Sequence, residues 1–291
     1  MKIKNAEAQP FDKLSKLKWS GWIPLVWYFV FLVCPVLIVT VFSFLSRGTY
    51  GGIKWEWTFD NYLRIFQGVY LQIFFESLKL SALTTALCLL LGFPMAWVMA
   101  TFESKFRQLA LILIAIPFLT NLIGRVYALK LFAGYDGPLV ATLGYLGFTV
   151  DPHSFTHNEF MVMYGMVANY LPFMVLPLFS GLEKFDFTLL EAAADLGASR
   201  WTIFTKIILP CSFTSILTGS VMVFVPCLGE FVIPDLLGGA KAMLIGNLIT
   251  EQFLKSRDWP FGSAISVLLL LVLSVSAIIF IKRVHSGKAQ T

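Results

Sequence analysis

The chain has 291 residues, of which 57% are hydrophobic and only 13% are charged, and its mean hydropathy is +0.77. Soluble domains carry about a quarter charged residues, so this composition excludes an ordinary soluble enzyme and indicates a helical membrane protein. The formal net charge of +5 does not indicate a nucleic-acid partner, because the basic residues gather at the ends of apolar runs and form no single basic stripe.

Six apolar runs are each close to the roughly 20 residues that cross the hydrocarbon core as a helix. We expect transmembrane helices at residues 22–45, 77–101, 109–132, 160–182, 211–234 and 262–281. The first run is too long for the apolar core of a signal peptide and lacks a small-residue cleavage site, so we count it as a span. The chain then divides into an N-terminal segment, 1–21, a six-span domain, 22–282, and a C-terminal tail, 283–291.

The distribution of Lys and Arg predicts the orientation, since short cytoplasmic loops carry an excess of these residues. They are more frequent in both terminal segments and in the loops after the second and fourth spans than in the other loops. We therefore expect both termini and the loop 183–210 to be cytoplasmic. The last outer loop has apolar residues at mixed helical spacing, which predicts a helix at the membrane surface: Met243, Leu244, Leu248, Ile249 and Phe253.

The loop between the fourth and fifth spans carries helix signals that a slack connection would lack. Thr188 with Glu191 predicts a capping box at the start of a first helix. Gly197 predicts the end of that helix, because glycine adopts left-handed backbone without penalty. Ser199 predicts the cap of a second helix, and Pro210 is expected to close the unit. We expect two short helices outside the bilayer.

The same loop resembles the EAA loop of binding-protein-dependent ABC importer permeases. The shared pattern is EAA, three residues, Gly, nine residues, Ile, one residue and Leu-Pro, and the matched positions are Glu191, Ala192, Ala193, Gly197, Ile207, Leu209 and Pro210. The resemblance implies an all-α permease of the type I (MetI-like) fold with six transmembrane helices in a bacterial inner (plasma) membrane. It also implies a cytoplasmic coupling helix that sits in a cleft of an ATPase subunit.

Longer segments are similar to the spermidine/putrescine branch of these permeases, namely TFDNYLRIF, IPFLTNLIGRVYALK, LPFMVLPLFSGLEKFD, GEFVIPDLLGGAKAMLIGN and RDWPFGSA. This resemblance implies an ATP-driven importer of polyamines. The implied partners are two ATPase copies, a second homologous permease in a heterodimer, a periplasmic or lipid-anchored polyamine-binding protein, and membrane lipid. An importer of another small solute, such as an amino acid or iron, would carry the same loop and stays an alternative.

No catalytic motif is present in the sequence. The chain lacks G-x-x-x-x-G-K-[ST], HExxH and GxSxG, so we expect no enzyme activity, and ATP and Mg²⁺ to be used by the partner ATPase. His153 and His157 have no third ligand nearby, so we predict no metal or cofactor in this chain. A secondary transporter driven by an ion gradient is a further alternative, although it would need no ATPase loop.

A second set of residues concerns the solute pathway. An ionisable group in hydrocarbon costs at least ~2.5 kcal/mol, so one found late in a span is expected to face a cavity or a partner. Glu230 and Asp235 lie at the glycine-rich end of the fifth span, where two carboxylates would favour a cationic solute. Tyrosine rings would add cation–π contacts, and the candidates are Tyr127, Tyr164 and Tyr170. Alternatively, Glu230 pairs with Arg125 or with a partner chain.

Overall fold

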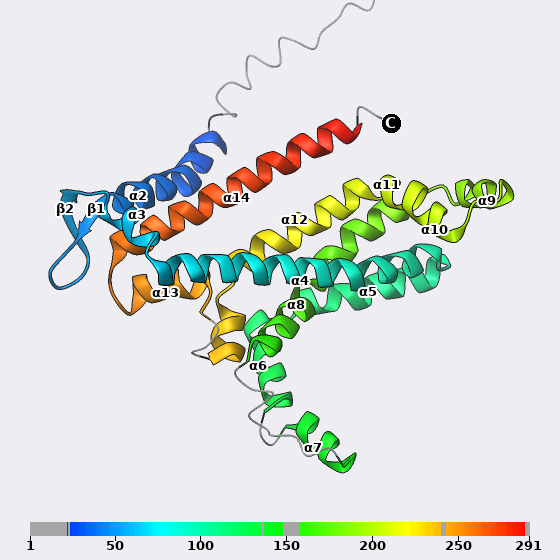
Figure 1. Ribbon diagram of the computed structural model, residues 1–291, viewed down its shortest axis with the longest axis horizontal. Coiled ribbons are helices and arrows are strands. Elements are labelled where there is room, and N and C mark those ends of the chain that lie inside the picture. The colour runs from blue at the N-terminus through cyan, green and yellow to red at the C-terminus, as the bar shows by residue number, and fades with distance from the viewer. Residues whose placement is uncertain (1–21, 23, 135–136, 148–157, 240–242, 289–291) are drawn as a thin grey trace, which may run out of the picture.

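The computed structural model describes residues 22, 24–134, 137–147, 158–239 and 243–288. Helices run along the long axis of the molecule, and one two-stranded hairpin lies at one end (Figure 1). The elements, with η for a π-helix, are η1 (Phe29–Val33), α2 (Cys34–Ser43), β1 (Leu45–Arg47), β2 (Ile53–Trp57), α3 (Asp60–Ile65), α4 (Gly68–Thr101), α5 (Ser104–Leu119), α6 (Leu122–Phe132), α7 (Pro138–Tyr145), α8 (Glu159–Leu182), α9 (Thr188–Asp195), α10 (Arg200–Ile203), η3 (Phe204–Ile208), α11 (Leu209–Cys211), α12 (Phe213–Gly229), η4 (Pro234–Gly238), α13 (Ile245–Leu254) and α14 (Trp259–Lys288).

The described residues contain four helices that are long and apolar enough to cross a membrane, or up to six spans if two bent pairs are each counted as one. The four are Pro24–Ser43, Gly68–Thr101, Glu159–Leu182 and Trp259–Ile278. They correspond to the first, second, fourth and sixth expected spans. The helix α4 begins earlier than expected, so residues assigned to an outer loop extend the second span.

The third expected span is not one helix. Its two halves, Ser104–Pro117 and Leu122–Phe132, are bent by 87°. Pro117 cannot donate a backbone hydrogen bond, and Thr120 and Asn121 are extended. The Asn121 side chain then accepts from the N–H of Ile123 at 2.9 Å and starts α6 as an N-cap. The expected span at 109–132 is thus a bent pair of helices, and Asn121 is the signal for the start of the second helix.

The fifth expected span is bent as well, with 65° between Arg200–Cys211 and Phe213–Gly229. Its helix α12 ends at Gly229, five residues before the predicted end, because Glu230 is extended (φ −67°, ψ 131°). Pro210 was expected to end the two-helix unit of the loop 183–210, but it does not. The helical backbone continues through it to Cys211 and bends at Ser212.

A π-helix precedes two of the prolines. The N–H of Cys34 donates to the carbonyl of Phe29, and the N–H of Leu209 donates to that of Phe204, so each bond spans five residues. Pro35 and Pro210 follow directly, and a proline ring crowds the carbonyl four residues before it. The wider π turn accommodates that crowding while the helix continues.

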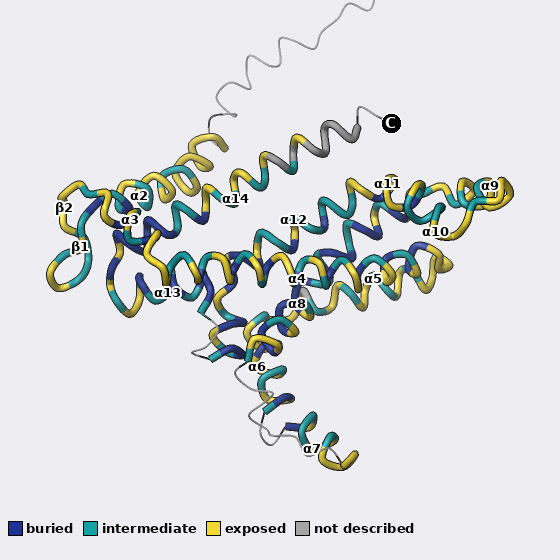
Figure 2. The backbone as a smooth tube through the Cα atoms, in the orientation of Figure 1, coloured by how far each residue is buried: buried dark blue, intermediate teal, exposed yellow. Residues whose placement is uncertain are grey.

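The core is built around α8, which packs against α4 and α12. Its buried residues dominate the centre of the molecule, whereas α2 and α9 are largely exposed (Figure 2). Close approach is possible because Gly219 of α12 lies on Met174, where an added Cβ would come 3.2 Å from the Met174 carbonyl oxygen. The buried residues of α8 are Met161, Val162, Gly165, Met166, Asn169, Tyr170, Pro172, Met174, Val175, Leu178, Phe179 and Leu182.

A second apolar cluster joins α13 and α14 to α3 and the start of α4. Phe261 is fully buried at its centre, and Leu248 of α13 packs there. A helix was expected at this place from the spacing of apolar residues, and α13 confirms it. Its buried residues belong to this second cluster, so α13 is a packing element there.

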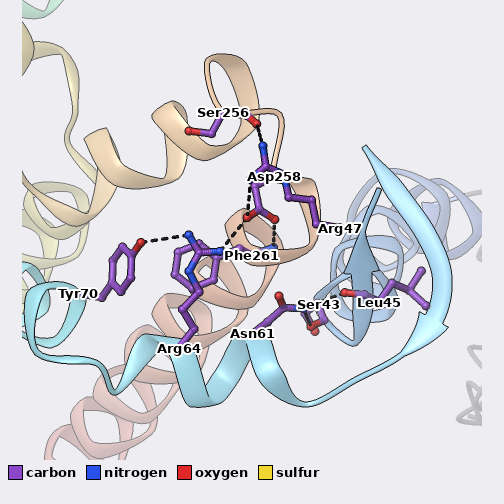
Figure 3. A network of polar contacts seen from close by, with 9 residues as sticks. All are labelled: Ser43, Leu45, Arg47, Asn61, Arg64, Tyr70, Ser256, Asp258 and Phe261. Atoms are coloured by element: carbon purple, nitrogen blue, oxygen red, sulfur yellow. Dashed lines mark hydrogen bonds and ion pairs between the residues drawn. The ribbon is translucent and has the colours of Figure 1, made fainter. Parts of the chain in front are cut away.

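A polar network ties the hairpin end of the molecule together (Figure 3). Asp258, which is 1% exposed, accepts from Arg64 Nη1 at 2.9 Å and lies 3.9 Å from Arg47 Nη1. Its other oxygen accepts from the N–H of Phe261, so the same carboxylate caps α14. The Asn61 amide donates to the carbonyls of two residues at the end of the first span, Ser43 and Leu45.

Arg64 is the cation that holds this network. It donates to the hydroxyl of Tyr70 at 3.1 Å, and its guanidinium lies 4.0 Å from the ring centroid of Phe261. Burial lowers the pKa of Arg64, but the hydrogen bonds with Tyr70 and Asp258 outweigh burial and raise it above the usual value. The carboxylate of Asp258 thus joins β1, α3 and the start of α14.

Replacing Arg64 by Met tests this network, because it removes the charge and keeps an apolar side chain beside Phe261. We expect a loss of about 2–3 kcal/mol, since a buried carboxylate loses its main partner while the arginine was partly exposed. Tryptophan fluorescence during heating of the detergent-solubilised protein measures it. Lys54→Met removes an exposed ion pair with Glu56 and should leave the melting temperature unchanged. Equal melting temperatures for both variants would contradict the role of Arg64.

Candidate functional site

The loop 183–210, here called the coupling loop, lies at the end of the molecule opposite the hairpin (Figure 1). Its first helix, α9, begins at Thr188, and Asp186 provides the cap: its Oδ1 accepts from the N–H of Thr188 at 3.0 Å and from its hydroxyl at 2.7 Å. These two bonds lower the pKa of Asp186. The expected capping box of Thr188 with Glu191 was wrong, because Thr188 is inside the first turn.

The turn between the two short helices has the geometry that the sequence predicted. Gly197 has φ +79°, and the N–H groups of Gly197 and Ala198 donate to the carbonyls of Ala194 and Ala193. This pair of hydrogen bonds is a Schellman motif. The hydroxyl of Ser199 then accepts from the N–H of Thr202 at 3.2 Å and caps α10, as expected.

The surface of this unit is apolar and open. Leu196 is 89% exposed and Trp201 is 73% exposed, while Glu191 and Ala192 are also exposed. Large apolar side chains that are exposed on a protein surface often mark a contact with another protein. The surface of the coupling loop, residues 189–201, is therefore suited to cover by another protein.

Aromatic rings join the base of the coupling loop to α4. Trp97 lies with its ring centroid 5.7 Å from Phe187 and 6.4 Å from Phe185, and Phe93 lies 5.9 Å from Phe204. An ion pair between Arg107 of α5 and Glu183, at 2.9 Å, adds a second link. None of these contacts was predicted, because each joins segments far apart in the sequence.

The remaining matched positions lie on the helical stretch that leads to α12. Ile207 is half-buried, whereas Leu209 and Pro210 are exposed. They sit where η3 passes into α11, directly before the bend at Ser212. The motif thus covers both the exposed surface and the joint behind it.

The carboxylate of Glu230 lies in the break after α12 and is 7% exposed. Its Oε1 accepts from the N–H groups of Phe231 at 3.0 Å and Val232 at 2.8 Å, and more distantly from Ile233 at 3.4 Å. The hydroxyl of Tyr170 donates to Oε2 at 2.5 Å. The structure thus brings two of the expected pathway residues into direct contact.

The other pathway candidates are separate from this pair. Tyr127 and Tyr164 are about half exposed, and Asp235 is exposed. The Nε of Arg125 is buried and makes no hydrogen bond within the described residues, so the expected pairing of Arg125 with Glu230 does not occur within the chain. A cavity of about 340 Å³ opens beside α4 and the start of α8, and charged residues line it beside apolar ones: Glu76, Lys79 and Glu159. None of these three residues was predicted from the sequence.

No group of three or more His, Cys, Asp or Glu side chains able to hold a metal occurs among the described residues. His153 and His157 lie outside the described residues.

Residues 14–289 match the family of binding-protein-dependent transport system inner membrane components. The chain belongs to this family, and it is a permease subunit of an inner-membrane transporter. It is 40% identical over 254 residues to the spermidine/putrescine transport system permease protein PotB of Haemophilus influenzae, covering 87% of this chain and 89% of that protein. PotB of Escherichia coli K12 is 41% identical, with coverage of 87% and 92%.

Solved structures support the fold. The permease chain of a bacterial alginate ABC transporter, in complex with its alginate-bound periplasmic protein, superposes with a TM-score of 0.71 at 20% identity. It covers 92% of this chain and 93% of that chain. A chain of the MetNI methionine ABC transporter gives 0.54 at 14% identity, with coverage of 75% and 95%. The expected all-α importer fold is thus confirmed.

The aromatic base of the coupling loop gives a testable expectation. Trp97→Leu removes two ring contacts, each worth about 0.5–1.5 kcal/mol beyond burial, so residues 183–210 should open more often. Limited proteolysis of membrane vesicles should then cleave this loop several-fold faster. Trp57→Leu, at a side chain that is 71% exposed on the hairpin, should leave the cleavage rate unchanged. Equal rates for Trp97→Leu and the unaltered chain would show that these ring contacts do not hold the loop.

Proposed function

We propose that the chain is the permease subunit of an ATP-driven importer of polyamines such as spermidine and putrescine. The assignment of polyamines as the solute rests on the identity of about 40% to PotB over most of both chains. An amino acid or iron importer is the alternative, and the ligand of the cognate receptor decides between them. The chain has no phosphate-binding loop, so ATP hydrolysis belongs to a separate partner ATPase.

The coupling loop is the proposed contact with that ATPase. The surface of α9 has little relief, because it carries the small residues Ala192 and Ala193 beside Glu191. Exposed apolar area follows it in the chain, at Leu196 and Trp201. Two ATPase copies would serve this permease and a second homologous permease. A periplasmic or lipid-anchored binding protein would deliver the solute at the hairpin end. Both termini and the coupling loop would then be cytoplasmic, as the Lys and Arg distribution favours.

We propose that the solute pathway passes the three exposed or half-exposed pathway residues, Asp235, Tyr127 and Tyr164. Asp235 offers a carboxylate, while Tyr127 and Tyr164 offer aromatic faces, and the cavity lined by Glu76 and Glu159 adds negative charge. Carboxylates raise the local concentration of a cation, and aromatic faces bind ammonium groups.

Gly197→Val tests the coupling loop. An added Cβ meets no atom within 4 Å, so the whole effect comes from the left-handed backbone, which costs about 1–2 kcal/mol for a residue with a side chain. We expect the solute moved per ATP to fall roughly fivefold or more, while the protein stays in the membrane. The measurement is uptake and ATP hydrolysis in proteoliposomes.

The matched control for that experiment is Gly68→Val at the start of α4. An added Cβ there also meets open space, and the backbone is ordinary. This variant should transport like the unaltered chain. Normal coupling in Gly197→Val would count against the loop as the ATPase contact.

Asp235→Asn tests the solute pathway. The chain is expressed with the proposed ATPase, second permease and receptor of its own transporter, and uptake of labelled spermidine is measured. We expect the apparent KM to rise about three- to tenfold, because one carboxylate–ammonium contact near the surface is worth about 0.5–1.5 kcal/mol. Asp60→Asn, an exposed carboxylate on α3, should leave KM unchanged. Uptake of an amino acid or iron in place of spermidine by the unaltered complex would favour the alternative solute.

A further inference from the structure

One side chain, Glu230, satisfies the polar groups at the break after α12. One of its carboxylate oxygens accepts from the N–H groups at the start of the segment 231–238, which contains η4. Its other oxygen accepts from the hydroxyl of Tyr170 of α8. Within a membrane, backbone N–H groups at such a break have no water to bind, so a side chain must satisfy them. Both oxygens of the carboxylate are thereby occupied within the chain, which leaves little for a solute.

The segment 231–238 and the break before it both fit closely against neighbouring helices. On the α8 side, a Cβ on Gly165 would lie 2.6 Å from Leu237 Cδ1 and 3.1 Å from Ile233 Cγ2. At the break, a Cβ on Gly246 of α13 would lie 2.6 Å from the carbonyl oxygen of Gly229 and 2.8 Å from that of Glu230. Contacts of this length leave no room for a methyl group, so the position of the segment is closely defined.

One helix connects this segment to the coupling loop. A bend at Ser212 follows the loop, and α12 runs from there to Gly229 as one helix (Figure 1). The bend at Ser212 and the break at Glu230 lie at the two ends of α12.

We propose that Glu230 is a positioning residue: with Tyr170 it fixes the segment 231–238 at the far end of α12, so that movement of the coupling loop moves this segment and opens or closes the pathway. This proposal rests on the proposed function. It replaces the expectation from the sequence that Glu230 binds the cationic solute.

The test uses the complete complex in proteoliposomes, with labelled spermidine uptake and ATP hydrolysis measured together. Glu230→Gln keeps an oxygen for the amides and an amide that can pair with Tyr170. We expect spermidine moved per ATP to fall about twofold with KM unchanged, because a neutral amide accepts weaker hydrogen bonds than a carboxylate. Tyr170→Phe loses one buried hydrogen bond without changing any charge, and should lower spermidine per ATP about threefold with KM unchanged.

Glu230→Ala removes both the cap and the bond to Tyr170. We expect spermidine per ATP to fall about tenfold or more, with ATP hydrolysis less affected. Tyr145→Phe, at a side chain that is 94% exposed, is the control for the tyrosine change and should behave like the unaltered chain. If Glu230→Ala fails to assemble, Glu230→Gln and Tyr170→Phe still decide the matter.

Two results would overturn the proposal. A tenfold rise of KM in Glu230→Gln would show that the charge binds the solute. Uptake and ATP hydrolysis that fall together in Tyr170→Phe and Glu230→Ala, at an unchanged ratio, would show that the pair only stabilises the fold. A wrong assignment of the solute can be told apart from these results, because the unaltered complex would then not take up spermidine. The ratio of solute moved to ATP hydrolysed can be measured with whichever solute that complex does move.

Discussion

The constraint on which this structure depends is that backbone polar groups must find partners inside the protein wherever water is absent. The chain interrupts its helices often, and a side chain satisfies the new helix start at several of these places. Asn121 starts α6, Ser199 starts α10, Glu230 starts the segment after α12, and Asp258 starts α14. Each of these capping residues favours a new helix start at its own position. The bend before α6 and the break after α12 are thus stabilised by polar side chains.

Features governed by neighbouring residues were predictable from the sequence. Apolar runs gave most spans, Gly197 gave the left-handed turn, and Ser199 gave the second cap. The family motif pointed to the loop 183–210 as the proposed ATPase contact from residue types and their spacing alone. The first cap of that loop was assigned to Thr188 although Asp186 stands two residues earlier, because both residue types cap helices and the pattern alone does not rank them.

The features that were missed depend on contacts between distant segments. The 87° bend at Asn121 falls inside a run that is long enough for one span, so a count of apolar residues could not find it. The contact of Tyr170 with Glu230 joins two spans, and composition gave each residue a role in binding without showing that they bind each other. Arg64 and Asp258 lie in loops that read as ordinary outer connections. Burial and pairing are properties of the folded chain, and they change what a charged residue can do.

The ion pair of Arg64 with Asp258 joins residues 194 positions apart, and the carboxylate also caps the last span. A growing chain that enters the bilayer from its N-terminus therefore carries Arg64 without its partner until nearly the whole protein has been synthesised. The network at the hairpin end can be completed only after the start of the last span has been made. Biogenesis of this subunit thus has a late closing step, in which the final helix secures segments that were placed in the membrane long before it.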